Sequence, residues 1–227
     1  MDGEPAHLAA TRSGYDAIAG QYAETFRAEL EQAPLDRAVL AAFAELVRRA
    51  HPEAPVLEVG CGPGAVTAHL SALHLDVRGI DLSPAMVDLA RQEHPDLGFE
   101  VGEMGRLDRR DGELAGLVSW YSLIHVPAPH RRSVLEEFHR VLRPGGYVLI
   151  AFQVGHDTLH LDEAFGRAVS LDFHRLQPDD VEALLDGAGF EPAARMVKAP
   201  EPSSAASQVP QCFVIARRPL GGAWAQE

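Results

Sequence analysis

Cysteine is scarce in this chain. Only Cys61 and Cys212 occur among its 227 residues. Two cysteines this far apart in the sequence make neither a metal cluster nor a disulfide framework. The chain is therefore not a cysteine-built scaffold, and we expect no metal site in it.

Positive charge is also in short supply. The chain has 20 lysines and arginines against 33 acidic residues, a net charge of −13 at pH 7. A nucleic-acid backbone has to be met by clustered lysines and arginines. The pairs Arg109-Arg110 and Arg131-Arg132 are short and lie among acids, so we interpret them as solvated. This balance predicts that the chain has no nucleic-acid partner.

Long apolar runs are missing as well. No run approaches the roughly 20 residues that a membrane-spanning helix needs. Residues 1–14 lack the apolar core of a secretion signal. We therefore expect no membrane partner and a cytoplasmic location. A chain of 227 residues can bury a sizeable core, so we expect one domain over residues 1–227.

The most informative stretch is residues 56–70, VLEVGCGPGAVTAHL. A short apolar run typical of a buried strand comes first. Gly60, Gly62 and Gly64 follow at alternate positions, and apolar residues at helical spacing come next. The glycines allow a sharp turn and leave no Cβ where a ligand approaches. Strand, glycine turn and helix open a nucleotide-binding α/β fold.

The glycine spacing distinguishes between two classes of cofactor. A dinucleotide site uses G-x-G-x-x-G, and a phosphate-binding loop needs a lysine after the glycines. Here the pattern is E-x-G-x-G-x-G without that lysine, and Glu58 is placed to face the ligand. A carboxylate repels a pyrophosphate but suits a cation.

The stretch resembles motif I of the class I S-adenosylmethionine-dependent methyltransferases, whose donor carries a sulfonium and an ammonium. The resemblance implies cofactor binding by the turn around Glu58, Gly60, Cys61, Gly62 and Gly64. Within that turn we interpret Cys61 as a small packing residue. A glycine turn in some other α/β protein is the alternative.

Two later segments also resemble this family. Residues 77–80 are predicted to form a second strand that ends at Asp81, and an acid at that place can accept both ribose hydroxyls. The tract DLSPAMVDLARQ implies that Leu82 and Met86 flank the adenine, although Met86 could instead face the core. After a third strand over residues 99–101, the family places an acid at the adenine amino group. The residues there are Gly102, Glu103 and Met104, with glutamate in place of the commoner aspartate.

Residues 11–33 are predicted to be helical, with an aromatic and apolar stripe that includes Tyr15 and Tyr22. Because this helix precedes the first strand, it has no place in the alternating α/β unit. It resembles the YDxxAxxY stretch that precedes motif I in many small-molecule methyltransferases. Tyr15 and Tyr22 are therefore candidates for closing the cofactor pocket, with simple core packing as the alternative.

Candidate catalytic residues follow a fourth strand over residues 114–119. His125 lies at the carboxyl edge of the sheet, where such folds bind ligands, and can accept a proton near neutral pH. Its alternative role is packing or helix capping. Tyr121 is the next candidate, as a residue whose hydroxyl orients the reactants. Trp120 is expected to line the pocket at the methionine end of the cofactor.

The sequence also indicates the kind of acceptor. The Asn/Asp-Pro-Pro-Tyr tract that the family uses on nucleic-acid or protein nitrogens is replaced by Ser119-Trp120-Tyr121-Ser122. Residues 153–175 are predicted to be an insertion of helical character, whose histidines His156, His160 and His174 could enter the acceptor pocket. A small organic acceptor fits this pattern best.

These observations predict one α/β domain. It would have a helical cap over residues 1–50, a cofactor-binding core over 51–152, and an acceptor-side insertion with the last strands over 153–227. The resemblance implies a Rossmann-like, doubly wound seven-stranded sheet of order 3-2-1-4-5-7-6, with strand 7 antiparallel.

The resemblance further implies methyl transfer from S-adenosylmethionine to an O, N or C atom of a small acceptor, in specialised metabolism, by a monomer or homodimer. The alternatives are a non-methylating reaction such as cyclisation, or a non-catalytic binding protein.

Overall fold

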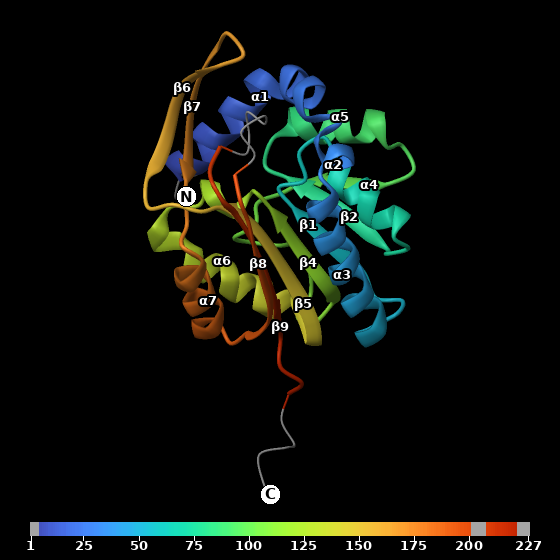
Figure 1. Cartoon of the computed structure of the whole chain (residues 1–227). Coiled ribbons are helices and arrows are strands. Elements are labelled where there is room, and N and C mark those ends of the chain that lie inside the picture. The colour runs from blue at the N-terminus through green and yellow to red at the C-terminus, as the bar shows by residue number, and fades with distance from the viewer. Residues whose placement is uncertain (1–4, 201–207, 222–227) are drawn as a thin grey trace, which may run out of the picture.

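The computed structural model describes residues 5–200 and 208–221. A seven-stranded sheet forms its centre (Figure 1). Across the sheet the strands run in the order β3 (Gly98–Val101), β2 (Val77–Asp81), β1 (Val56–Val59), β4 (Leu114–Trp120), β5 (Leu142–Gln153), β9 (Gln211–Arg217) and β8 (Glu191–Lys198). The first five strands are parallel, and β9 is antiparallel to both β5 and β8. The predicted strand order, with its antiparallel seventh strand, is confirmed.

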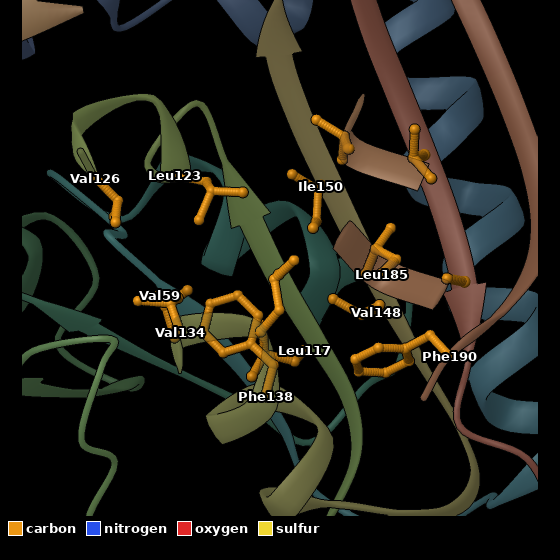
Figure 2. Close-up of a cluster of buried hydrophobic side chains, with 14 of the residues drawn as sticks. Val59, Leu117, Leu123, Val126, Val134, Phe138, Val148, Ile150, Leu185 and Phe190 are labelled. Atoms are coloured by element: carbon orange, nitrogen blue, oxygen red, sulfur yellow. The ribbon is translucent and has the colours of Figure 1, made fainter. Parts of the chain in front are cut away.

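Helices cover both faces of this sheet. The helices α3 (Pro34–Ala50) and α4 (Ala65–Ala72) pack on one face, and α6 (Ala128–Val141) and α7 (Pro178–Gly187) pack on the other. The helix α5 (Pro84–Glu93) lies against β2 and β3. Figure 2 shows the cluster under α6 and α7, where Phe138 and Leu185 meet Leu117 and Val148 of the sheet. Strands β1 and β4 are buried on both faces, which explains their continuous apolar sequences.

The N-terminal cap crosses the carboxyl ends of the parallel strands. The predicted helix over residues 11–33 divides into α1 (Ala6–Phe26) and the short α2 (Glu29–Gln32). Asp16 of α1 bonds to the segment after β2, and Tyr15 bonds to the segment after β4, so α1 lies across this edge (Figure 1). None of the described helices is both long enough and apolar enough to cross a membrane.

The insertion after β5 differs from the prediction. Residues 153–175 were expected to have helical character, but they contain the hairpin β6 (Thr158–Ala164) and β7 (Arg167–His174), a separate two-stranded sheet. The expectation was wrong because apolar and polar residues alternate here with the period of a strand. Phe165 and Gly166 form the turn, both with positive φ, as a two-residue hairpin loop of type I′ requires.

Candidate functional site

A cavity of about 110 Å³ lies at the carboxyl edge of the sheet, beneath α1. Open α/β sheets bind ligands in this position. Most of the residues that the sequence singled out line this cavity: Tyr15, Tyr22, Gly60, Gly62, Asp81, Leu82, Met86, Gly102, Glu103, Met104, Trp120, Tyr121 and His125. The structure therefore brings together residues from the cap and from the ends of β1, β2, β3 and β4.

Three of the proposed residues lie elsewhere. Glu58 and Cys61 line a neighbouring, larger cavity, and Gly64 lines neither. A Cβ on Gly64 would meet the Phe99 ring at 2.8 Å, so this glycine serves the packing of the turn that begins α4. The Cys61 side chain is buried in a cluster with Val87 and Phe99, as a packing residue would be.

Gly60 and Gly62 have different tasks in the turn. Both have positive φ. A Cβ on Gly60 would come within 2.3 Å of Ser122 Cβ, because the ends of β1 and β4 are held close together by the Ser122 hydroxyl, which donates to the Val59 carbonyl at 2.6 Å. A Cβ on Gly62 would meet nothing within 4 Å. Gly60 therefore permits close approach of the chain, and Gly62 leaves cavity space open.

The Asp81 carboxylate is fixed at the cavity wall by the backbone. The Gly62 N–H donates to Oδ2 and the Ser83 N–H donates to Oδ1, each at 2.8 Å. Burial raises the pKa of Asp81, while these hydrogen bonds oppose the rise. The glycine turn and the end of β2 therefore orient one carboxylate, whose remaining lone pairs can accept further hydrogen bonds.

The Glu58 carboxyl is buried within the sheet. Only 2% of this residue is exposed, and the Thr67 hydroxyl donates to its Oε2. Burial raises the pKa of Glu58 to about 8, and the nearby Asp81 contributes to the rise. Glu58 is therefore mostly protonated at neutral pH, and a cation brought beside it would favour ionisation.

Tyr121 holds an unusual backbone conformation at the end of β4. Its φ is +52°, which is uncommon for a residue other than glycine. Its hydroxyl donates to Oε1 of Gln211, and its ring lies edge-on to Trp120, at 5.6 Å between centroids. Trp120 and Tyr121 each line both cavities. The strained turn thus aims two aromatic side chains at the place where the cavities meet.

His125 is bonded through both ring nitrogens. Its Nδ1 lies 2.8 Å from the Asp172 carbonyl, which can only accept, so Nδ1 carries the proton. Its Nε2 therefore accepts from the Tyr15 hydroxyl, also at 2.8 Å. Burial lowers the pKa of His125 to about 4, which keeps the ring neutral. Both ring nitrogens are thus bonded to protein groups, and the residue also lines the smaller cavity.

The larger cavity has a volume of about 490 Å³ and lies beside the first. The two share Tyr15, Tyr22, Gly60, Gly62, Trp120 and Tyr121. The hairpin β6–β7 and the helix α1 supply much of the remaining wall. The site is therefore a pair of adjoining cavities that meet at an aromatic boundary.

Known proteins show the same domain. A family model described as a methyltransferase domain matches residues 56–146, the segment from β1 into the start of β5. Residues 56–146 therefore match a methyltransferase domain. The predicted membership of the class I S-adenosylmethionine-dependent methyltransferases is confirmed.

Curated relatives match part of this chain. An uncharacterized methyltransferase of Bacillus velezensis is 29% identical over 125 residues, which are 55% of this chain and 59% of the relative. A ubiquinone biosynthesis O-methyltransferase of Nitrosococcus oceani is 29% identical over 150 residues, 60% of this chain and 63% of the relative. The chain thus spans less than two thirds of the length of these relatives.

Solved structures share the fold over nearly the whole chain. A complex of DhpI with S-adenosylhomocysteine superimposes with a TM-score of 0.71 at 22% identity, covering 96% of this chain and 99% of that one. Magnesium protoporphyrin IX methyltransferase from Synechocystis, with bound S-adenosylmethionine, gives 0.70 at 14% identity, covering 96% and 100%. At such identities the likeness establishes the fold of the methyltransferase domain.

Sequence reasoning missed several residues of the domain's site. Leu8, Thr11 and Arg12 of α1 line the smaller cavity. Asp16 accepts from the Ser83 hydroxyl at 2.5 Å and from the Ala85 N–H at 3.2 Å, and so anchors α1 to α5. Helical spacing from Tyr15 could have indicated Leu8, Thr11 and Arg12, which lie on the same face. The partners of Asp16 could not be read locally, because Ser83 is far away in the sequence.

Two of the insertion's histidines are bonded to other side chains of the hairpin. His160 lies between the carboxylates of Asp162 and Asp172, at 3.1 Å and 2.7 Å, on the exposed side of the hairpin. His174 bonds to Thr158 at 2.8 Å. Over residues 5–200 and 208–221, no group of three or more histidines, cysteines and acids is arranged to hold a metal ion.

Proposed function

We propose that this protein transfers a methyl group from S-adenosylmethionine to an O, N or C atom of a small organic acceptor. The observation that carries the proposal is the Asp81 carboxylate, oriented by the Gly62 and Ser83 N–H groups at the wall of a glycine-floored cavity. Such a carboxylate accepts hydrogen bonds from both hydroxyls of a ribose. The methyltransferase domain match over residues 56–146 supports this assignment.

In this proposal the smaller cavity binds the donor along its length. The adenine would lie near Leu82, Met86, Gly102, Glu103 and Met104, which come from the segments after β2 and β3. The carboxylate of Glu103 can accept from the exocyclic amino group. The methionine end would then point toward Gly60, Trp120 and Tyr121, where the second cavity begins.

Methyl transfer is an in-line displacement, so alignment is the main requirement. Holding both reactants in a reactive geometry can lower a barrier by about 7–11 kcal/mol. Trp120 and Tyr121 stand at the boundary of the two cavities and would align the acceptor with the sulfonium. Tyr15 and Tyr22 also stand there, on α1, and would exclude water.

A proton leaving the acceptor would pass to His125 by way of Tyr15. Tyr15 lines both cavities, and its hydroxyl donates to Nε2 of His125. The low pKa of about 4 makes His125 a weak base, so its contribution is secondary to alignment. This arrangement suits an acceptor that has little need of deprotonation.

We place this reaction in specialised metabolism, in the cytoplasm, in a monomer or homodimer without a nucleic-acid partner. The net charge of −13 supports the last point, since it offers no excess of lysine and arginine for phosphates. The structural likeness to a DhpI complex that contains S-adenosylhomocysteine supports the donor.

The donor site is tested by calorimetric titration with S-adenosylhomocysteine. We expect wild-type protein to bind in the micromolar range and Asp81→Ala to bind about tenfold to a hundredfold more weakly, because two hydrogen bonds to a charged group are lost. Asp88→Ala, an exposed acid on α5, is the control and should bind as wild type does.

Equal affinity for wild type and Asp81→Ala would contradict the proposed ribose contact. Formation of S-adenosylhomocysteine in the presence of an acceptor separates methyl transfer from a cyclisation or a purely binding role.

A further inference from the structure

We infer that the larger cavity binds the methyl acceptor, and that this acceptor is an apolar molecule of drug-like size without a negatively charged group. The inference rests on the proposed function, because the donor must occupy the smaller cavity for the two reactants to meet. Its own support comes from the size, the walls and the charge of the larger cavity.

The cavity is large enough for a ring-bearing molecule. Its volume of about 490 Å³ falls within the 300–1,000 Å³ that is typical of small-molecule sites. It opens onto the smaller cavity at Trp120 and Tyr121, where the transferred methyl would be presented. A molecule bound here would therefore have one atom beside the donor and its remainder enclosed by the hairpin and α1.

The hairpin β6–β7 is built with one apolar face, and that face lines the cavity. Leu159 is paired with Phe173, and Leu161 with Leu171, so all four side chains share a face. All four line the cavity. The alternate residue His160 is on the other face, where it bonds to acids. The helix α1, which contacts β7 and lies beside it in Figure 1, adds Ile18 and Phe26.

Phe165, in the turn of the hairpin, has a backbone conformation that phenylalanine rarely adopts. Phe165 has a φ of +51° and is 44% exposed, yet its side chain lines the cavity. Asparagine, aspartate or glycine fits this turn position better. An apolar ligand in the cavity gives the ring a partner that solvent does not.

The charge of the wall selects against anions. Among the described residues that line the cavity there is no lysine, arginine or histidine, whereas Glu29, Asp36, Glu58 and Glu163 all line it. Asp36 is neutralised by Lys198, at 2.5 Å in a buried pair. Glu58 is mostly protonated at neutral pH. An acceptor carboxylate or phosphate would therefore find no cation in this wall and would face the acid Glu163.

The other polar groups of the cavity wall are suited to binding a neutral or cationic acceptor. Gln153 and Gln211 are register partners on β5 and β9, and the Tyr121 hydroxyl bonds to Gln211. Amide and phenol groups can bind a hydroxyl, carbonyl or amine of the acceptor. The acceptor atom that receives the methyl would lie at this end, beside Tyr121.

The test uses three probes with one ring system: 2-naphthol, 2-naphthylmethylamine and 2-naphthoate. Each is titrated calorimetrically at pH 7 into protein saturated with S-adenosylhomocysteine. We expect the neutral and cationic probes to bind at least about tenfold more tightly than the anionic one. Glu163→Lys should narrow that ratio, whereas Glu24→Lys, at an exposed position of α1 outside the cavity, should not.

Two exposed leucines form a matched pair for the hairpin wall. Leu159 is 42% exposed and lines the cavity, and Leu35 is 50% exposed and does not. Leu159→Ala should weaken 2-naphthol binding about threefold to tenfold, and Leu35→Ala should leave it unchanged. Both changes are at the surface, so both variants should fold.

The outcomes separate the two proposals. If S-adenosylhomocysteine binds but 2-naphthoate binds as tightly as 2-naphthol, if no probe binds, or if the two leucine variants behave alike, this inference is overturned and the donor site stands. If S-adenosylhomocysteine itself fails to bind, the proposed function is overturned.

Discussion

Two carboxyl groups at the ends of neighbouring strands are held in different states by their surroundings. Asp81 accepts two backbone hydrogen bonds, which favour its ionised form against the effect of burial. Hydrogen bonds from the hydroxyl and the backbone of Thr67 only partly offset the burial of Glu58, and its pKa rises to about 8. Asp81 is thus oriented to accept hydrogen bonds, whereas Glu58 would ionise when a cation binds beside it.

Glu58→Gln should therefore change stability in a way that depends on pH. The folded-state pKa of about 8 lies above the unfolded value of about 4.5, so the protonated form stabilises the fold. The free energy of unfolding should fall as pH rises from about 4.5 to 8 in wild type. Glutamine mimics the protonated acid, so the variant should lose this fall and be the more stable protein at pH 8.

The measurement is urea unfolding at pH 5, 6.5 and 8. Glu45→Gln, an exposed acid on α3, serves as the control and should keep the wild-type slope. A Glu58→Gln variant whose slope equals that of wild type would contradict the buried, protonated state.

At the scale of elements, the helix α1 and the hairpin β6–β7 together cover the sheet edge. The hairpin supplies the Asp172 carbonyl that fixes the His125 ring, and that ring accepts from Tyr15 of α1. On its other side α1 is held by Asp16 at the start of α5. Two hydrogen bonds thus hold α1 on the sheet edge, one from Tyr15 to His125 and one from Ser83 to Asp16. The first of them requires a neutral His125.

The pKa of His125 predicts how the attachment of α1 to the sheet edge responds to a fall in pH. Its folded-state pKa of about 4 is below the unfolded value of 6.5, so its stabilising effect is complete above pH 6.5. As pH falls from 6.5 to about 4, the free energy of unfolding should decrease, by at most about 1.4 kcal/mol per pH unit from this group. His125→Asn should make that decrease shallower.

His160 provides a control of opposite sign. The carboxylates of Asp172 and Asp162 raise the pKa of His160, so its charged form stabilises the fold at low pH. This contribution is fully present below pH 6.5 and is lost as the pH rises above that value, so His160→Asn should leave the decrease between pH 6.5 and 4 unchanged. Equal slopes for wild type and His125→Asn in unfolding titrations between pH 4 and 7 would contradict a neutral His125 at the cap.

At the scale of the whole molecule, the parts that could be predicted are those in which local pattern determines structure. The buried run before Gly60 predicts a strand, and the glycine turn predicts the first α/β unit. The strand order followed from resemblance to a family, since alternation of strands and helices leaves the order open. The order is confirmed in the structure.

The parts that failed or could not be foreseen depend on long-range contacts. Residues 153–175 are predicted to be helical, although the strand period of two in residues 158–174 is already present in the sequence. The bond between Tyr15 and His125 joins residues 110 positions apart. No local pattern reveals that the candidate base is already engaged by the cap.

The central claim is that the smaller cavity is built for a positively charged nucleoside donor and not for a diphosphate. Calorimetric titration with S-adenosylmethionine and, separately, with NAD⁺ tests it most directly. The account predicts one molecule of S-adenosylmethionine bound per chain in the micromolar range and no detectable heat of binding with NAD⁺. Binding of NAD⁺, or no binding of S-adenosylmethionine, would contradict it.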